Sequence, residues 1–387
     1  MISNALEKLE KNRSEIEQWF EYMHRHPELS MKEFKTASYL GALLNSWGYE
    51  VDTGIGKYGI VATLKVGDSR KSIGLRADFD ALPIQEVNDL PYKSTVEGVS
   101  HLCGHDGHSA MLLAAAKYLA ETKSFNGTLR LIFQPGEETM EGAPAMIEDG
   151  LFSRFPVDAV FGMHNMPGLA LGKLYFADGE VMAAVDNWEI ELTGKGSHGS
   201  MPELGIDPVV AGSSLVMALQ TIVARNVAPA DSAVVTVGAF LSGSAGNAVA
   251  QSAILRLSIR TKSPADRKLV LDKIRLLTKH QAEGYACTYE IREGIPGAVL
   301  VNDAAETRKA SEIAKQAFGE ENVVYPGPTF LGSEDFAFML QQKPGTYCFI
   351  GNGDTPMVHH PEFTFNKSNL TRGAAYWVAL VEGYLKD

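Results

Sequence analysis

The order of hydrophobic and polar positions along the chain predicts alternating helices and strands. Apolar residues recur at helical spacing over residues 4–25 and again up to about Trp47, where Gly48 ends the pattern. Two strand-like runs follow at 60–66 and 72–78, and the short Gly-containing link between them predicts a β-hairpin. Helical and strand patterns then continue to alternate, which favours an α/β sheet flanked by helices.

Ser30 and Glu33 stand three residues apart, just before the second helical run. This is the spacing of a capping box, in which two side chains bond the free backbone N–H groups at the start of a helix. We therefore predict that the second helix opens at this pair.

The pattern changes from about Asn187 onward. The expected elements there are a strand at 187–193, a helix at 207–224, strands at 233–239 and 253–261, a helix at 264–283 and a strand at 285–292. This βαββαβ order is typical of a ferredoxin-like α+β sandwich. We therefore predict a discontinuous α/β domain with a mixed sheet, residues 1–186 and 298–387, into which residues 187–297 are inserted.

Composition excludes several classes of function. The 387 residues carry a net charge of -12 without charged blocks, which argues against nucleic acid or an anionic membrane as a partner. The sequence contains no apolar run near 18 residues and no signal-like start, and its three cysteines are too few for a disulfide framework. These features predict a cytoplasmic protein.

Residues 101–108 read His-Leu-Cys-Gly-His-Asp-Gly-His and precede an apolar helical run. Thiolate and imidazole, as in Cys103 and His105, are the ligands that zinc-type metals prefer, and a helix N-terminus stabilises a thiolate. We therefore hypothesise a metal site. The alternative interpretation is a polar turn whose histidines cap the helix.

Further ligand-type residues follow other predicted strands. Glu137 and Glu138 come after a buried strand, His164 ends another, and the last segment contains His359 and His360. Taken singly, each of these side chains is more often structural or solvent-exposed. Together with Cys103 and His105, they can line one cleft and hold two metal ions, leaving a carboxylate free.

Adjacent glutamates suit hydrolytic chemistry. Successive side chains of an extended segment diverge, so one of Glu137 and Glu138 can bind metal while the other faces the substrate as a general base. A metal-bound water would attack a carbonyl, and the metals would stabilise the oxyanion. The pattern therefore indicates a hydrolase.

Ordered motifs extend the picture over most of the chain. They comprise His24 with residues 27–30, and the segments 74–83, 103–108, 133–138, 164–168, 194–199, 332–336 and 359–361. The sequence resembles the M20 metallopeptidase family, and within it the branch of aminoacylases, hippurate hydrolases and auxin-conjugate amidohydrolases.

This resemblance implies a set of roles in the discontinuous domain, which would be the catalytic one. Two divalent ions, zinc or else manganese, cobalt or nickel, would bind to five side chains: Cys103, His105, Glu138, His164 and His359. Cys103 would take the bridging place and Glu137 would be the general base. His359 is preferred to His360 because the family histidine stands two before the proline. Asp78 resembles a carboxylate that orients a metal ligand.

The resemblance also implies roles for the inserted domain, which would serve as a lid and as a dimerisation domain. His198 would reach the scissile carbonyl or its oxyanion, as the family's lid histidine often does from a dimer partner. Asn247 and Arg260 resemble a pair that holds the substrate's α-carboxylate. We therefore expect a homodimer whose lid closes over the cleft and excludes water.

The predicted function is removal of an N-acyl group, acetyl or aromatic acyl, from an amino acid, a small-molecule substrate. N-acetyl-diaminopimelate deacetylase and dipeptidase activities are alternatives within the same family. A catalytically inactive metal-binding protein, and a thiol enzyme with Cys103 as nucleophile, are alternatives from other classes.

Overall fold

The computed structural model describes residues 2–386, and the chain divides into two units. Unit 1 consists of Met1–Val181, Val301–Thr329 and Asp335–Asp387, and unit 2 of Met182–Leu300 and Phe330–Glu334. The short second piece of unit 2 lies in what the sequence suggested was the first domain. Within unit 2 it is held by a hydrogen bond of 2.9 Å from Ala183 N–H to the Gly332 carbonyl.

Unit 1 is built on one mixed sheet of eight strands in the order β1-β2-β4-β3-β5-β16-β6-β15. The strands are β1 (Glu50–Ile55), β2 (Gly59–Val66), β3 (Ser72–Asp78), β4 (Gly127–Gln134), β5 (Ala159–Pro167), β6 (Leu174–Tyr175), β15 (Val323–Val324) and β16 (Gly345–Gly353). Strands β4, β3, β5 and β16 run parallel to one another. Every residue of β5 is buried, as expected for a central strand covered on both faces.

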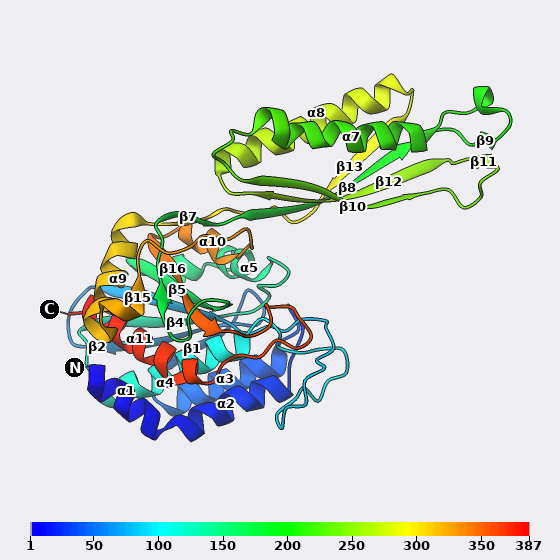
Figure 1. Ribbon diagram of the computed structural model, residues 1–387. Helices are drawn as coiled ribbons and strands as arrows, with labels where there is room; N and C mark the ends of the chain where they lie inside the picture. Colours follow the sequence, from blue (N-terminus) through cyan, green and yellow to red (C-terminus); the bar gives the residue numbers. More distant parts are fainter. Residues whose placement is uncertain (1, 387) are drawn as a thin grey trace. The chain divides into compact units, whose positions relative to one another are not determined.

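Helices cover both faces of this sheet. They are α1 (Ile2–Lys11), α2 (Arg13–Arg25), α3 (Phe34–Ser46), α4 (His105–Thr122), α5 (Gly142–Glu148), α6 (Leu151–Arg154), α9 (Ala304–Phe318), α10 (Phe336–Leu340) and α11 (Ser368–Tyr384). In Figure 1, α4 and α11 lie on one side of the strands with α1 to α3 beyond them, and α5 and α10 lie on the other side. This confirms the predicted α/β class.

The predicted hairpin of β2 and β3 is wrong, because β4 lies between the two strands. Val66 at the end of β2 and Ser72 at the start of β3 face the neighbouring residues Gly127 and Thr128 of β4. The link from β2 to β3 therefore crosses over β4, and the two strands that it joins lie about 10 Å apart. Asn126 stabilises this crossing, because its side-chain oxygen accepts the N–H groups of Asp68 and Ser69.

The N-terminal helices also differ from the prediction. One helix was expected over residues 4–25, but Asn12 leaves the helical conformation and separates α1 from α2. The second helix begins at Phe34 rather than at Ser30. Glu33 occupies its N-cap position, but neither the Ser30 nor the Glu33 side chain makes a capping hydrogen bond.

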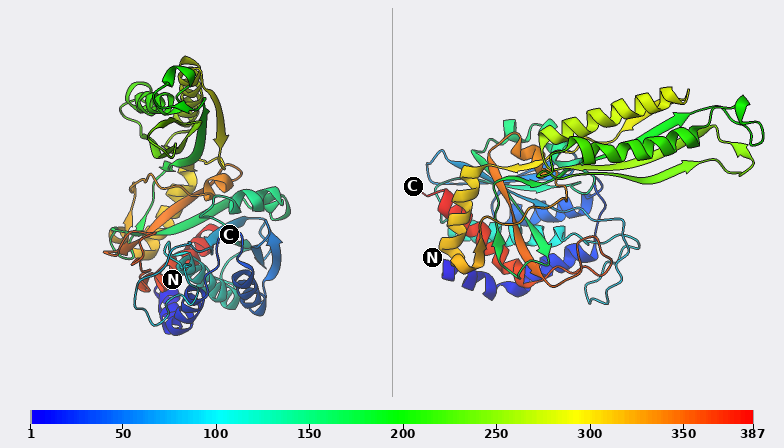
Figure 2. Two further views of the ribbon diagram at one scale, coloured as in Figure 1. Left: turned by 90° about the vertical axis from the view of Figure 1, so that its right-hand side faces the viewer. Right: turned by 45° about the horizontal axis from the view of Figure 1, so that its top comes forward.

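Unit 2 has the predicted ferredoxin-like order. Its elements are β8 (Ala184–Thr193), α7 (Pro208–Asn226), β10 (Ala233–Ser242), β12 (Ser252–Thr261), α8 (Pro264–Gly284) and β13 (Thr288–Glu293). The four strands form an antiparallel sheet in the order β10-β12-β8-β13, and α7 and α8 cover one face of it (Figure 1 and Figure 2). A short ribbon in unit 2 pairs β9 (Ser197–His198) with β11 (Ala248–Val249). Another ribbon pairs β7 (Gly179–Met182) with β14 (Leu300–Asn302), and most of its residues belong to unit 1.

Helix α7 has unusually apolar composition. Among the described residues it is the one helix whose length and hydropathy would suffice to cross a membrane. A core helix of a globular domain passes the same test, and Leu215, Leu219 and Ile222 of α7 pack into the unit 2 core. Val210 and Met217 on its other face are exposed.

Candidate metal centre

Cys103 and His105 are brought together by the turn that opens α4. Gly104 between them adopts a left-handed conformation with φ of +100°. A Cβ atom at this position would stand 2.2 Å from the side-chain oxygen of Asn165, so only glycine fits. The turn therefore directs the thiol and the imidazole from the helix start toward the end of β5.

The remaining predicted ligands come from the ends of neighbouring strands. Glu137 and Glu138 follow β4, and His164 lies in β5; both strands adjoin β3 and run parallel to it. His359 follows β16, and its N–H donates to the Leu102 carbonyl at 2.7 Å. Because the carboxyl ends of parallel strands meet at one edge of a sheet, residues distant in sequence converge here.

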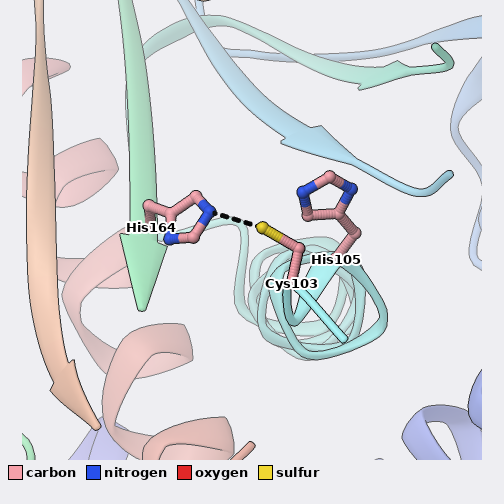
Figure 3. A group of neighbouring side chains, drawn as sticks. All are labelled: Cys103, His105 and His164. Carbon is pink, nitrogen blue, oxygen red and sulfur yellow. Dashed lines mark hydrogen bonds between the residues drawn. The ribbon is translucent and has the colours of Figure 1, made fainter. Parts of the chain in front are cut away.

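The structure gathers the five predicted ligands into two groups that share Cys103. Cys103 Sγ lies 3.4 Å from His164 Nε2, and His105 begins α4, two residues after Cys103 (Figure 3). On the other side, Glu138 Oε2 lies 3.3 Å from His359 Nε2. Two groups, Cys103–His105–His164 and Cys103–Glu138–His359, each have all ligand atoms within 4.8 Å of one another, and Cys103 belongs to both.

Two of these ligands each have a buried atom that lacks a hydrogen-bond partner among the described residues. The two atoms are His105 Nε2 and Glu138 Oε1, which lie 3.8 Å apart. This separation is too long for a hydrogen bond, and leaving both groups unsatisfied is costly. A divalent cation fits this position, because thiolate, imidazole and carboxylate are the donors that zinc binds.

The electrostatic field of the site also suits a cation. Burial opposes the charged imidazole, yet the negative charges of Asp78 and Asp80 prevail and raise the pKa of His105 to about 10. Burial, followed by the charges of Glu138 and Glu137, raises the pKa of the Cys103 thiol well above its usual value. Carboxylates thus accumulate around the thiol, and positive charge is needed to balance them.

Asp80 orients His105, whereas the sequence analysis expected Asp78 to orient one of the metal ligands. The Nδ1–H of His105 lies 3.1 Å from Asp80 Oδ1, which leaves Nε2 facing the site. Asp78 instead lies 2.6 Å from His108 Nδ1 and accepts a bond of 2.7 Å from Arg76. Asp80 could have been considered from the sequence, because it lies in the same motif as Asp78, two residues farther along the chain.

Arg76 links the sheet to the loops around the site. Its buried guanidinium donates to Asp78, to the Gln134 side chain at 2.8 Å and to Asp335 at 3.2 Å. Asp335 in turn accepts the N–H of Ala143 at 2.9 Å. This network fixes the end of β4, directly before Glu137, against α5 and α10.

The sequence analysis gave no role to two other buried histidines, His24 and His101. His24 lies 2.7 Å from Asp106 Oδ2 and 3.2 Å from Glu86 Oε1. Burial opposes its charge, but the two carboxylates prevail and raise the pKa of His24 to about 9. His101 has no hydrogen-bond partner among the described residues, and burial lowers its pKa to about 4.

In unit 2, His198 lies close to Asn247, and both residues lie far from Arg260. His198 lies in β9, which pairs with β11, and the N–H of Gly199 donates to the Asn247 carbonyl at 2.8 Å. Arg260 lies near the far end of β12, where it donates to the Leu331 carbonyl at 2.8 Å. The intervening strand makes the separation about 26 Å. One chain therefore does not bring the predicted carboxylate-binding pair together.

Comparison with known proteins adds independent information. Residues 74–383 match the family described as peptidase family M20/M25/M40. The chain is 45% identical over 372 residues to a hippurate hydrolase of Campylobacter jejuni, with 96% of this chain and 97% of that one covered. It is 37% identical over 356 residues to an N-acetyl-L-cysteine deacetylase of Bacillus subtilis, with 92% and 84% covered.

A solved structure from Bacillus subtilis, described as a dinuclear metal binding peptidase from the M20 family, superposes on this chain with a TM-score of 0.84. The two sequences are 31% identical, and 97% of this chain and 99% of the other are covered. The likeness extends over both units.

Proposed function

The chain belongs to peptidase family M20/M25/M40, and on this basis we propose that it is a metal-dependent amidohydrolase that removes an acetyl or aromatic acyl group from the nitrogen of an amino acid. The observation that carries this proposal is that Cys103 belongs to two groups of potential metal ligands. It belongs to one ligand group with His105 and His164 and to another with Glu138 and His359. These five side chains would hold two divalent ions, and Cys103 would be common to both groups.

We propose zinc as the native metal, because the donor set of sulfur, nitrogen and oxygen atoms suits it. Manganese, cobalt and nickel remain candidates, since selectivity among them depends on geometry and supply. When bound, such ions lower the pKa of a water molecule and polarise the carbonyl of an amide.

Glu137 is the proposed general base. Its carboxylate lies 3.9 Å from His105 Nε2, so it stands beside the ligands, on the extended segment that also carries Glu138. It would take a proton from the attacking water and return it to the leaving amine. The burial of Glu137 limits access of bulk water, which strengthens these charge interactions.

We assign support of the oxyanion to His198, and binding of the substrate's carboxylate to Asn247 and Arg260. Because one chain holds Asn247 and Arg260 about 26 Å apart, we propose that a second copy supplies the β9–β11 end to each site. A C2 dimer satisfies this requirement for both sites at once.

The proposed dimer forms through α7 and the edge strand β10. Met217 on α7 is 70% exposed and Leu241 on β10 is 49% exposed, which is unusual for such large apolar residues on a free surface. Strand β10 also presents one unpaired edge. We infer a cytoplasmic location, which the three free cysteines support.

The test is hydrolysis of a panel of N-acetyl and N-benzoyl amino acids, with N-acetyl-diaminopimelate and dipeptides included. The protein is stripped of metal and assayed before and after addition of zinc, manganese, cobalt or nickel. We expect amino acid release only after metal addition, strongest on an N-acyl amino acid. Release that persists in chelator would instead support a thiol mechanism through Cys103.

A further inference from the structure

Ser30 and Glu33 have the spacing of a helix cap, yet both side chains turn away from α3. Ser30 Oγ donates to Asp80 Oδ2 at 2.7 Å. The Glu33 carboxylate accepts the N–H groups of Met31 at 2.9 Å and of Gly136 at 2.8 Å. The segment therefore binds the loop that carries Glu137, about a hundred residues farther along the chain.

The position of Glu33 is costly for a carboxyl group. The residue is fully buried, and no cationic side chain among the described residues pairs with it. Burial, followed by the charge of Asp80, raises the pKa of Glu33 to about 7. Its second oxygen is also buried and has no hydrogen-bond partner within residues 2–386. A group retained at such cost is expected to serve something other than the stability of α3.

Gly136, which Glu33 holds, forms the turn directly before Glu137. It adopts a left-handed conformation with φ of +60°. A Cβ atom here would stand 2.6 Å from Met31 Sδ, so the turn packs closely on the segment that contains Glu33. The hydrogen bond to Gly136 N–H thus fixes the direction in which the chain enters Glu137.

The amide on the other side of Glu137 is held in the same way. Glu138 N–H donates to Asp80 Oδ2 at 3.0 Å, the same oxygen that accepts from Ser30. Two buried carboxylates therefore bind the backbone N–H groups that flank Glu137. These two bonds restrict the backbone on both sides of Glu137.

We propose that Glu33 is a positioning residue for the general base: its carboxyl holds the Gly136 amide and so aims Glu137 at the substrate. This inference rests on the proposed role of Glu137. The hydrogen bond requires only an acceptor oxygen, so glutamine can replace Glu33, whereas alanine cannot reach the amide and aspartate is one methylene too short.

Glu28 provides a matched control from the same segment. Its carboxylate accepts the N–H groups of Thr36 at 2.8 Å and of Lys35 at 3.2 Å, and so caps α3. Glu28 and Glu33 are thus both acceptors for backbone amides, but only Glu33 binds the turn before the base. Loss of Glu28 should lower the stability of the protein without changing kcat.

The experiment compares E33A, E33D, E33Q and E28A as metal-loaded proteins. For E33A and E33D we expect kcat to fall roughly 10- to 100-fold with KM and metal content little changed, as for other supporting residues around a catalytic centre. E33Q should stay within about threefold of the unchanged protein, since its amide oxygen still accepts the bond. If E33A does not fold, E33D carries the test.

A second measurement does not depend on activity. Hydrogen exchange of a peptide that covers residues 134–140, followed in metal-free protein, should be faster in E33A and E33D but not in E33Q or E28A. Unchanged kcat and exchange in E33A and E33D would overturn the proposal, as would an equal loss of kcat in E28A. E137Q, measured in parallel, separates the two ideas: turnover retained in that variant would refute the role of Glu137, whereas the exchange result reports on Glu33 alone.

Discussion

Asn247 lies before the start of β12 and Arg260 near its far end, and the strand between them spans about 26 Å, although both residues were assigned to the same substrate carboxylate. His198 lies beside Asn247, at the end of the unit 2 sheet that carries β9 and β11 (Figure 1). Two side chains at that distance cannot bind one small anion. If both are needed, a complete site requires two copies of the chain.

Complementation tests this requirement. N247A and R260A should each lose most activity, because the carboxylate of the substrate loses a partner. A heterodimer of the two has one site with both residues intact, so subunit exchange in an equal mixture should restore about a quarter of the original activity. Absence of recovery, with heterodimers shown to be present, would assign both residues to separate functions within one chain.

Replacement of Glu137 by glutamine tests the general base. Glutamine keeps the shape of the side chain but cannot accept a proton, so we expect kcat to fall by about 10²- to 10⁴-fold. Metal content, measured by atomic emission, should remain at two ions per chain because Glu137 is not a proposed ligand. A loss of metal in E137Q would instead make this carboxylate a ligand.

The number of bound ions tests the shared position of Cys103. C103A should retain fewer than about one ion per chain, because both ligand groups lose their thiolate. H359A should retain about one, because His359 belongs to only one of the two groups that contain Cys103. Equal loss in the two variants would contradict a bridging thiolate. The measurement is made after dialysis against trace-metal buffer.

Arg76 should matter more for stability than any exposed arginine. R76M leaves Asp78 and Asp335 buried beside an uncharged side chain, which should lower the free energy of unfolding by about 3–5 kcal/mol. R256M removes an exposed ion pair with Glu189 and should cost far less, because solvent screens that pair. Urea denaturation of the metal-free proteins gives both values, and similar losses would contradict the proposed role of the buried network.

His24 should make stability depend on pH. Its pKa in the folded protein is about 9, above the ordinary value of 6.5, because Asp106 and Glu86 favour the charged ring more than burial opposes it. The stabilisation is therefore complete below pH 6.5 and is lost as pH rises through 9, a change of up to about 3 kcal/mol. H24Q should lack this decline between pH 6.5 and 9 when metal-free proteins are compared by urea denaturation.

Hydrophobic periodicity was sufficient for the class of fold and for the order of elements in unit 2, because burial imposes a period of two on strands and about 3.6 on helices. It could not identify strand neighbours. The crossing from Val66 to Ser72 around β4 has the same local sequence signals as a hairpin, and the choice between them depends on a strand some sixty residues away.

The candidate site was likewise predictable from the sequence only in part. The sequence by itself determined which side chains can bind metal, since thiol, imidazole and paired carboxylates are chemically distinctive, and the structure brings Cys103, His105, Glu138, His164 and His359 to one place. Only the tertiary structure decided that Asp80 rather than Asp78 orients His105, that Glu33 holds the turn before Glu137, and that Asn247 and Arg260 lie far apart. Hydrogen bonds and distances of this kind depend on how segments remote in sequence pack, whereas the chemistry of a side chain is a property of the residue itself.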